Sequence, residues 1–252
     1  MLEKLQGVVI KTQDYKETHK IITIFSDKLG KFTALARGVK KPKSRMAATT
    51  QPFVYGEFLV YVSKGKGLGT IQQASIVHSM RQIREDIEKN AYASYVLELT
   101  DTLTENKQPL PDIYNELFHT LQWIAERDEY VIPAMMYELK LYEVGGFSPV
   151  LNRCVRCGST QLPFSFSIRE GGVLCNTCSH VDEQSIMLQG KLAHILHAFQ
   201  QVSIEQIGNI SLKQKNKELL RMLLDHYYDS YGSYPIKTKR FIKQLDALTG
   251  EN

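Results

Sequence analysis

The sequence lacks the features that mark membrane or secreted proteins. Its longest stretch without Lys, Arg, Asp or Glu is Gly67–Met80, which is polar in part and shorter than the roughly 20 apolar residues of a membrane helix. The first residues carry an acid, Glu3, and one short apolar run, Val8–Ile10, which does not match a secretory signal. We therefore expect a cytoplasmic protein with no membrane segment.

Recognisable catalytic motifs are also missing. Gly-Lys occurs at positions 30–31, 65–66 and 190–191, but Ser or Thr never follows, so the sequence has no phosphate-binding loop of the Gly-x-x-x-x-Gly-Lys-Ser/Thr kind. It contains neither His-Glu-x-x-His nor Gly-x-Ser-x-Gly. These absences predict that the protein is not an enzyme and has no catalytic residues. The alternative is a nuclease or redox enzyme whose active site these motifs do not describe.

The charge is unevenly distributed. The 252 residues carry a net charge of +4, yet positions 1–81 hold fourteen Lys and Arg against five acids. The remainder is therefore acidic overall. Such an asymmetry predicts that the N-terminal part binds a polyanion. The densest cluster has no acid between its cations, and its members are Arg37, Lys40, Lys41, Lys43 and Arg45. A solvated loop without a ligand would explain this cluster equally well.

The first 80 residues read as β structure. Segments rich in β-branched and aromatic residues occur at 7–11, 21–25, 31–36, 58–62 and 70–77, separated by turn residues such as Asp27 and Gly30. Five short strands in about 80 residues are too few for two packed sheets. They fit a small barrel, and the oligonucleotide-binding (OB) fold is the obvious candidate.

From Met80 the apolar period changes from two to nearly four. Apolar residues spaced so that they share one helix face predict a long helix over 80–103. Further helices are expected at 112–127, 131–145, 185–200, 212–231 and 236–248. The expected fold class is therefore α+β: an N-terminal OB-fold β-barrel, then an all-helical domain with an inserted module. The expected domain bounds are 1–80 for the barrel, 81–149 with 183–252 for the helical domain, and 150–182 for the module.

All four cysteines fall within this module, as Cys154-Val-Arg-Cys157 and Cys175-Asn-Thr-Cys178. Two Cys-x-x-Cys pairs at this separation are typical of a tetrahedral Zn²⁺ site. The alternating Phe164–Ile168 segment and Gly171-Gly172 between the pairs predict a zinc-ribbon-like hairpin. Four thiolates leave no open position for water, so we expect one structural zinc per chain. A redox dithiol and four inert thiols are the alternatives.

The order of these parts, with the Ala36-Arg37-Gly38-Val39-Lys40-Lys41 stretch and Gly145-Gly146-Phe147-Ser148-Pro149 before the cysteines, resembles the RecO family of bacterial DNA repair and recombination mediators. The resemblance covers the whole chain. It implies binding of single- and double-stranded DNA, annealing of complementary strands, and loading of recombinase on DNA coated by the single-stranded-DNA-binding protein SSB, in the RecF pathway. Some family members lack the four cysteines, which implies that zinc supports the fold and is not needed for annealing.

The resemblance also implies the partners: RecR, the acidic tail of SSB, indirectly RecA, and a nucleoid-associated location. For the DNA groove we expect the clustered cations and three further lysines; the full set is Lys31, Arg37, Lys40, Lys41, Lys43, Arg45, Lys64 and Lys66. Aromatic residues that could stack on bases, or could equally belong to the core, are Tyr15, Phe32, Tyr55 and Tyr61. A zinc-ribbon factor that binds RNA or protein through the ribbon is a competing hypothesis, although that hairpin offers only Arg169 and Glu170 near its tip.

Overall fold

The computed structural model describes residues 1–62, 68–208 and 210–249. These residues form two compact units, one of Met1–Tyr130 with the segment from Ile236 onward, and one of Val131–Pro235. Among the described helices, none combines the length and the apolar character needed to span a membrane. The expected bounds 1–80, 81–149 with 183–252, and 150–182 stay a prediction.

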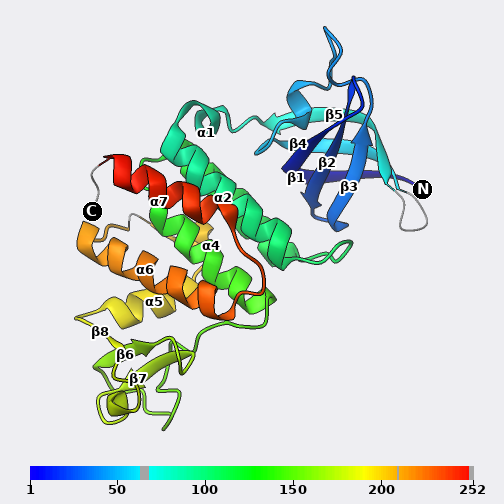
Figure 1. The fold of residues 1–252 in the computed structure, drawn as a ribbon. Coiled ribbons are helices and arrows are strands. Elements are labelled where there is room, and N and C mark those ends of the chain that lie inside the picture. Colours follow the sequence, from blue (N-terminus) through cyan, green and yellow to red (C-terminus); the bar gives the residue numbers. More distant parts are fainter. Residues whose placement is uncertain (63–67, 209, 250–252) are drawn as a thin grey trace. The chain divides into compact units, whose positions relative to one another are not determined.

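The first unit begins with a five-stranded barrel (Figure 1). Its strands are β1 (Leu2–Tyr15), β2 (His19–Ser26), β3 (Gly30–Ala36), β4 (Tyr55–Tyr61) and β5 (Gly69–His78). The order around the barrel is β1-β2-β3-β5-β4, and β1 closes it by pairing with β4. Every pair is antiparallel except β3 with β5. The expected OB-type barrel is confirmed.

Alternating apolar residues fill the barrel. Ile22 and Ile24 on β2 and Phe58 and Val60 on β4 are fully buried in the barrel core. Their neighbours along each strand are at least partly exposed, except Phe25, which is buried outside this core cluster. The period of two therefore places one face of each strand in the core. A register shift between Val9 and Lys11 bends β1 so that it pairs with both neighbours.

The described part of the first unit also contains four α-helices: α1 (Arg81–Glu85), α2 (Ile87–Leu103), α3 (Pro111–Glu126) and α7 (Lys237–Thr249). The expectation of one helix over 80–103 is wrong at Asp86. This residue is extended, and its carboxylate accepts hydrogen bonds from the N–H groups of Glu88 and Lys89. An Asp side chain at the N-cap binds two N–H groups that have no partner within the helix, so a new helix begins here.

Helix α7 packs against α2 although about 130 residues separate them in the sequence (Figure 1). Glu98 of α2 caps the start of α7, because its carboxylate accepts hydrogen bonds from the N–H groups of Lys237 (3.0 Å) and Thr238 (2.8 Å). Ile236 and Ile242 are buried. The C-terminal helix is therefore an integral part of the first unit.

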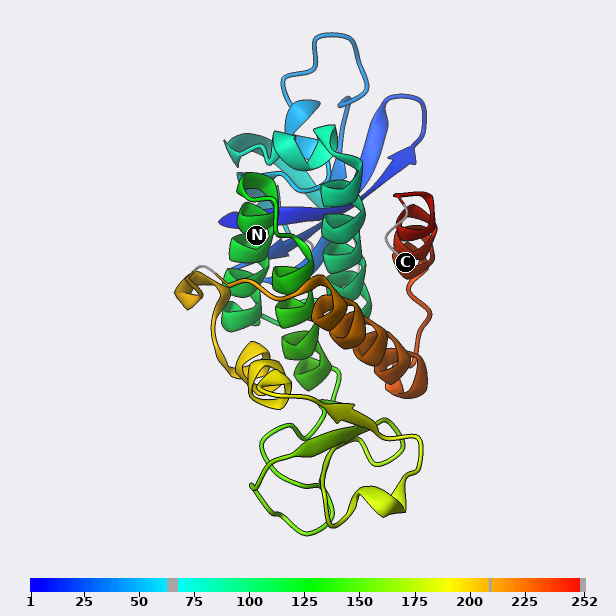
Figure 2. The same cartoon turned by 90° about the vertical axis from the view of Figure 1, so that its left-hand side faces the viewer.

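The second unit contains α4 (Val131–Val144), β6 (Phe164–Ser167), β7 (Gly172–Cys175), β8 (Ile186–Leu188), α5 (Leu192–Gln201) and α6 (Gln214–Tyr231). The three-stranded sheet, in the order β7-β6-β8, lies beyond the ends of the helices of this unit (Figure 2). The β6–β7 hairpin matches the expected ribbon. The expectation of a helix over 185–200 is wrong at its start, because β8 pairs with β6 and α5 begins only at Leu192.

A buried ion cluster joins α4 and α6. Glu138 is fully buried, and Arg221 approaches it at 2.6 Å and also binds Asp225 at 2.8 Å. Tyr142 donates its hydroxyl proton to Glu138 or to the carbonyl of Leu224. A buried charge that has lost its partner is strongly destabilising, so these side chains fix one arrangement of the two helices.

Candidate metal centre and nucleic-acid interface

The four cysteine sulfurs converge on one point of the second unit. Cys154 and Cys157 lie in the turn that precedes β6, Cys175 ends β7, and Cys178 follows it. All four Sγ atoms lie within 4.8 Å of one another, and those of Cys157 and Cys175 are 3.6 Å apart. Zn–S bonds of about 2.3 Å place the sulfurs of a zinc tetrahedron about 3.8 Å apart. The cluster therefore has the size of a zinc site.

Backbone hydrogen bonds shape both cysteine turns. The N–H of Gly158 donates to the carbonyl of Cys154 (2.9 Å), and the N–H of Cys178 donates to that of Cys175 (2.9 Å). Gly158 has a φ of +73°, in the left-handed region that glycine adopts without steric cost. The N–H of Val155 donates to the carbonyl of Val173 and joins the first turn to β7. The hairpin thus holds the two pairs of thiols together.

The electrostatics of the cluster favour a bound cation. Burial acts to raise the pKa of the Cys154 thiol, but hydrogen bonds from neighbouring backbone N–H groups outweigh it and lower the pKa to about 6. Burial and the adjacent thiols raise the pKa of Cys178 to about 12. Since four thiolates repel one another, all four ionise together only around a positive charge. The donor set fits a divalent ion that prefers sulfur, which is zinc in most such sites.

His180 stays outside this cluster. Its Nδ1 lies 2.8 Å from the carbonyl oxygen of Thr177, and its side chain is exposed. The four thiols alone fill a tetrahedron. A metal held by them would fold the module and join it to the helices.

The module already contacts α6 at two residues. The ring of Phe166 meets that of Tyr227 edge-on at 5.8 Å, and the hydroxyl of Tyr231 on α6 donates to the carbonyl of Ile168.

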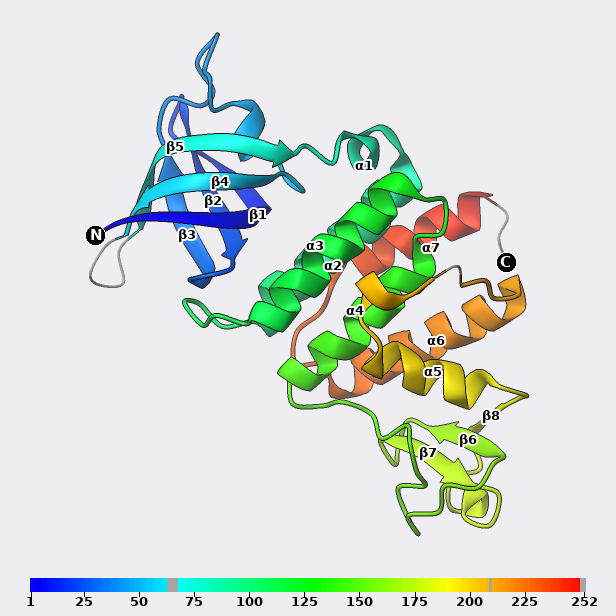
Figure 3. The same ribbon diagram turned by 180° about the vertical axis from the view of Figure 1, so that it is seen from behind.

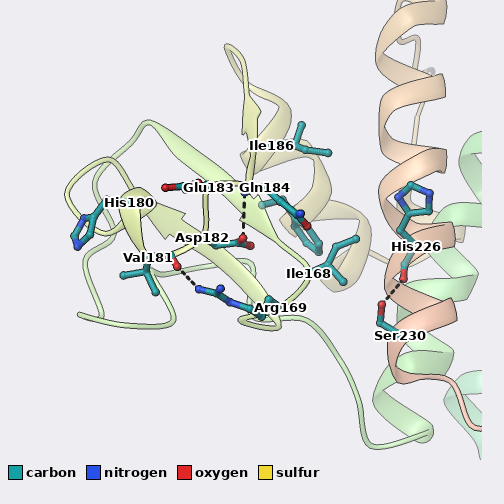
Figure 4. Close-up of a pocket in the computed structure, with 11 residues that line it drawn as sticks. Ile168, Arg169, His180, Val181, Asp182, Glu183, Gln184, Ile186, His226 and Ser230 are labelled. Carbon is teal, nitrogen blue, oxygen red and sulfur yellow. Dashed lines mark hydrogen bonds between the residues drawn. The ribbon is translucent and has the colours of Figure 1, made fainter.

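A cavity of about 870 Å³ lies between this module and α6 (Figure 4). Two of the charged side chains that line it are hydrogen-bonded within the module. Asp182 accepts hydrogen bonds from the Ser167 hydroxyl and the N–H of Gln184, and Arg169 donates to the carbonyl of Val181. These groups hold the hairpin to the segment after Cys178.

The cationic segment Arg37–Arg45, here called the basic loop, follows β3 and projects from the barrel (Figure 1, lighter blue). Val39 is 3% exposed and anchors the loop in the barrel core. The N–H of Gly38 donates to Nδ1 of His19 (3.0 Å), and the N–H of Lys40 donates to the carbonyl of Thr18 (3.0 Å). The loop is therefore fixed beside the tip of the β1–β2 hairpin.

The basic loop presents all its cations to solvent. Its five exposed cationic side chains are those of Arg37, Lys40, Lys41, Lys43 and Arg45. Lys40 also forms an ion pair of 2.7 Å with Asp14 on β1. The hydrogen bond from Lys40 holds the pKa of the Asp14 carboxyl below its usual value. Among the residues that the structure describes, Lys40 is thus the one cation of the basic loop that forms an ion pair, and the other four have no acidic partner.

Lys31, the other described lysine of the predicted set, lies away from the basic loop. Lys31 is 7% exposed, and its ammonium group donates to the carbonyl of Asp101 on α2 and lies 3.5 Å from the carboxylate of the same residue. Burial lowers the pKa of Lys31, and Asp101 opposes that shift. Lys31 joins the barrel to α2 and is not presented to a ligand. Lys64 and Lys66 lie outside the described residues.

The four aromatic residues divide into two pairs. Tyr15, at the β1–β2 tip, is 39% exposed, and Tyr61 at the end of β4 is 56% exposed. Phe32 is buried in the barrel, and Tyr55 packs on Phe118 of α3 with ring centres 4.5 Å apart. Tyr15 and Tyr61 therefore present ring surface to solvent, whereas Phe32 belongs to the barrel core and Tyr55 packs between the barrel and α3.

The sequence did not point to the hairpin tip as part of this surface. Lys16 lies there with its ammonium 5.5 Å from the centre of the Tyr15 ring, and Lys20 follows on β2. A positive φ of 54° at Lys16 marks the tight turn. The sequence contains one sign of this tip, a lysine beside an aromatic residue at a turn. The fold alone shows that hydrogen bonds hold the tip beside the basic loop.

Comparison with known proteins places this architecture. Residues 1–80 match the family model described as "Recombination protein O N terminal", and residues 84–240 match "Recombination protein O C terminal". The chain belongs to the RecO family. The resemblance inferred from the sequence is confirmed. The N-terminal RecO match contains the barrel and the basic loop, and the C-terminal match contains all four cysteines.

Individual relatives agree along nearly the full length. DNA repair protein RecO of Oceanobacillus iheyensis is 52% identical over 246 residues, which cover 98% of this chain and 95% of that protein. The DNA repair proteins RecO of Bacillus cereus strain AH187 and of Bacillus anthracis are each 41% identical over 246 residues, with 98% of both chains covered. The RecO architecture therefore spans both units.

Proposed function

We propose that this RecO family member binds single- and double-stranded DNA through its barrel, anneals complementary single strands, and helps load recombinase on SSB-coated DNA. One observation carries the proposal: the basic loop is pinned to the barrel by Val39 and by hydrogen bonds to the hairpin tip, so its cations form a fixed surface. Fixed cations neutralise phosphates without the entropy cost of ordering a loose segment.

Annealing requires no covalent chemistry. Two single strands repel each other through their phosphates, and a surface that neutralises several phosphates lowers this repulsion and releases condensed counterions. The exposed rings of Tyr15 and Tyr61 can stack on unpaired bases, and such stacking does not depend on the DNA sequence. We assign no catalytic residue. The zinc ion, held by Cys154, Cys157, Cys175 and Cys178, stabilises the second unit and does not contact DNA in this proposal.

The partners are proposed from family membership and charge. RecR and SSB are the direct partners, RecA is the indirect one, and all act at the nucleoid in the cytoplasm. SSB ends in an acidic tail with an apolar tip, and helix α7 offers matching chemistry. Phe241 is 42% exposed on α7, the exposed cation Arg240 precedes it, and the exposed cation Lys243 follows two positions later. We propose this face of α7 as the dock for the tail.

The test is an annealing assay with two complementary labelled oligonucleotides, without nucleotide or Mg²⁺. We expect the protein to accelerate pairing, because charge neutralisation needs neither. A preparation that leaves the rate unchanged would refute the annealing function. Shortened or modified strands would instead support the enzyme alternative. A protein that binds RNA through the isolated ribbon and leaves DNA unpaired would support the zinc-ribbon factor.

A further inference from the structure

A groove on the outer wall of the barrel borders the basic loop. It has a volume of about 580 Å³, within the range of small-molecule sites. Strands β4 and β5, which lie side by side in Figure 3, form one wall, and the end of the basic loop forms another. Its lining includes Lys4, Arg45, Met46, Leu59, Gln72 and Gln73.

The strand geometry explains why these side chains face outward. Phe58 and Val60 point into the barrel core, so Leu59 between them points out. The register pairs Leu59 with Gln73 and then Val60 with Ile71. Gln72 therefore has no opposite residue in β4, as expected at a β-bulge. Both glutamine side chains are exposed, and they place two amide groups on one stretch of the wall.

The groove combines three kinds of chemistry. Arg45 and Lys4 supply cations, and Lys4 is 3.1 Å from the carboxylate of Glu57, which offsets its charge. Met46 and Leu59 are partly buried and supply apolar surface. The amides of Gln72 and Gln73 supply both donors and acceptors. The net charge is thus small, and the surface is suited to a polar, flat, uncharged group attached to phosphate.

We propose that this groove receives an unpaired nucleobase of a DNA single strand whose backbone crosses the basic loop. This inference rests on the DNA binding proposed above. Arg45 belongs to both surfaces, which makes the path continuous. An unpaired base exposes its face to Met46 and Leu59 and its edge to the glutamine amides, which pair well with base edges. In a duplex that face is stacked and its pairing edge is used.

The groove therefore gives the protein a preference for single strands that the basic loop alone cannot supply. Phosphate contacts act on both single and double strands. Amide and apolar contacts to a splayed base act only on the former. This division predicts a characteristic signature: loss of the groove lowers affinity for single strands without altering the salt dependence, because no charge is removed.

The experiment measures binding of a fluorescent oligothymidine and of a duplex of equal length, across a salt series. The double variant Gln72→Ala with Gln73→Ala should bind the single strand about tenfold more weakly, with an unchanged salt slope and duplex affinity within about twofold. Gln108→Ala, an exposed glutamine between α2 and α3, is the matched control. Ser75→Phe, which fills the groove from β5, should have the same effect as the double variant.

A second measurement avoids variants. Light-induced cross-linking of a 5-iodouracil oligonucleotide to the full-length protein should label the peptide that contains Gln72 and Gln73 or the one that contains Met46. The groove is excluded if both groove variants bind single strands normally and no cross-link falls there, while alanine replacement of the basic-loop lysines still weakens DNA binding. If the unaltered protein binds no DNA in dilute buffer, the proposed function itself fails.

Discussion

Replacing Lys40, Lys41 and Lys43 together with alanine removes three of the five exposed cations of the basic loop. None of the three side chains is buried. The loop should keep its position, because Val39 and the hydrogen bonds of Gly38 and Lys40 that anchor it use a buried side chain and backbone N–H groups. The change therefore acts on charge and leaves the fold intact.

The magnitude follows from counterion release. Each phosphate neutralised on a single strand contributes about −0.7 to the slope of log affinity against log salt. Loss of three contacts should make the slope shallower by about 2. Between 50 and 200 mM salt the unaltered protein should then lose about 20-fold more affinity than the variant. Because Asp14 already neutralises part of the Lys40 charge, Lys40 should contribute less to this change in slope than Lys41 or Lys43.

The assay is fluorescence anisotropy with a labelled oligothymidine over a salt series. The matched control replaces Lys191, Lys213 and Lys215, three exposed lysines of the second unit, and changes the net charge by the same amount. The control should keep the slope of the unaltered protein. Equal slopes for the loop variant and the unaltered protein would show that DNA binds elsewhere and would refute the reasoning.

Three further predictions concern other parts of the molecule. Metal analysis should return about one zinc per chain, and Cys154→Ser should lower the melting temperature of the second unit; a well-folded protein free of metal would reject the site. Asp14→Asn should free Lys40 and strengthen DNA binding a few-fold at low salt, whereas Glu105→Gln, an exposed acid elsewhere, should not; equal effects would mean that only net charge matters. Tyr61→Ala should weaken binding of single strands by about 1–3 kcal/mol and spare duplexes, as titrations of both can decide.

The sequence predicted what local patterns encode. Alternation of apolar residues located the barrel strands, and the spacing of the thiols located the cluster, because both depend on residues a few positions apart. The same local logic failed at Ile186–Leu188. This segment fits a helix by its own pattern, but pairing with β6 makes it a strand, and Gly190 with a φ of +61° ends it before α5.

Features that depend on distant residues could not be predicted. Lys31 looked like a surface cation, yet Asp101 lies 70 positions away and binds it. Glu138 is fully buried, and Arg221, 83 positions away in the sequence, provides the partner that makes this burial tolerable. The basic loop was found from its charge, whereas its companion at the hairpin tip required the fold, since His19 and Gly38 meet only through β2 and β3.

The capping of α7 by Glu98 makes the first unit discontinuous along the chain. During synthesis, α2 emerges from the ribosome more than a hundred residues before the helix that covers it. The face of α2 that α7 covers therefore stays exposed while Val131–Pro235 is synthesised and folds. A ribosome that stalls before Ile236 would thus release a barrel whose supporting helices lack their last member, a species prone to aggregate or to be degraded. Completion of the first unit therefore requires synthesis of all of the second unit and of α7 after it.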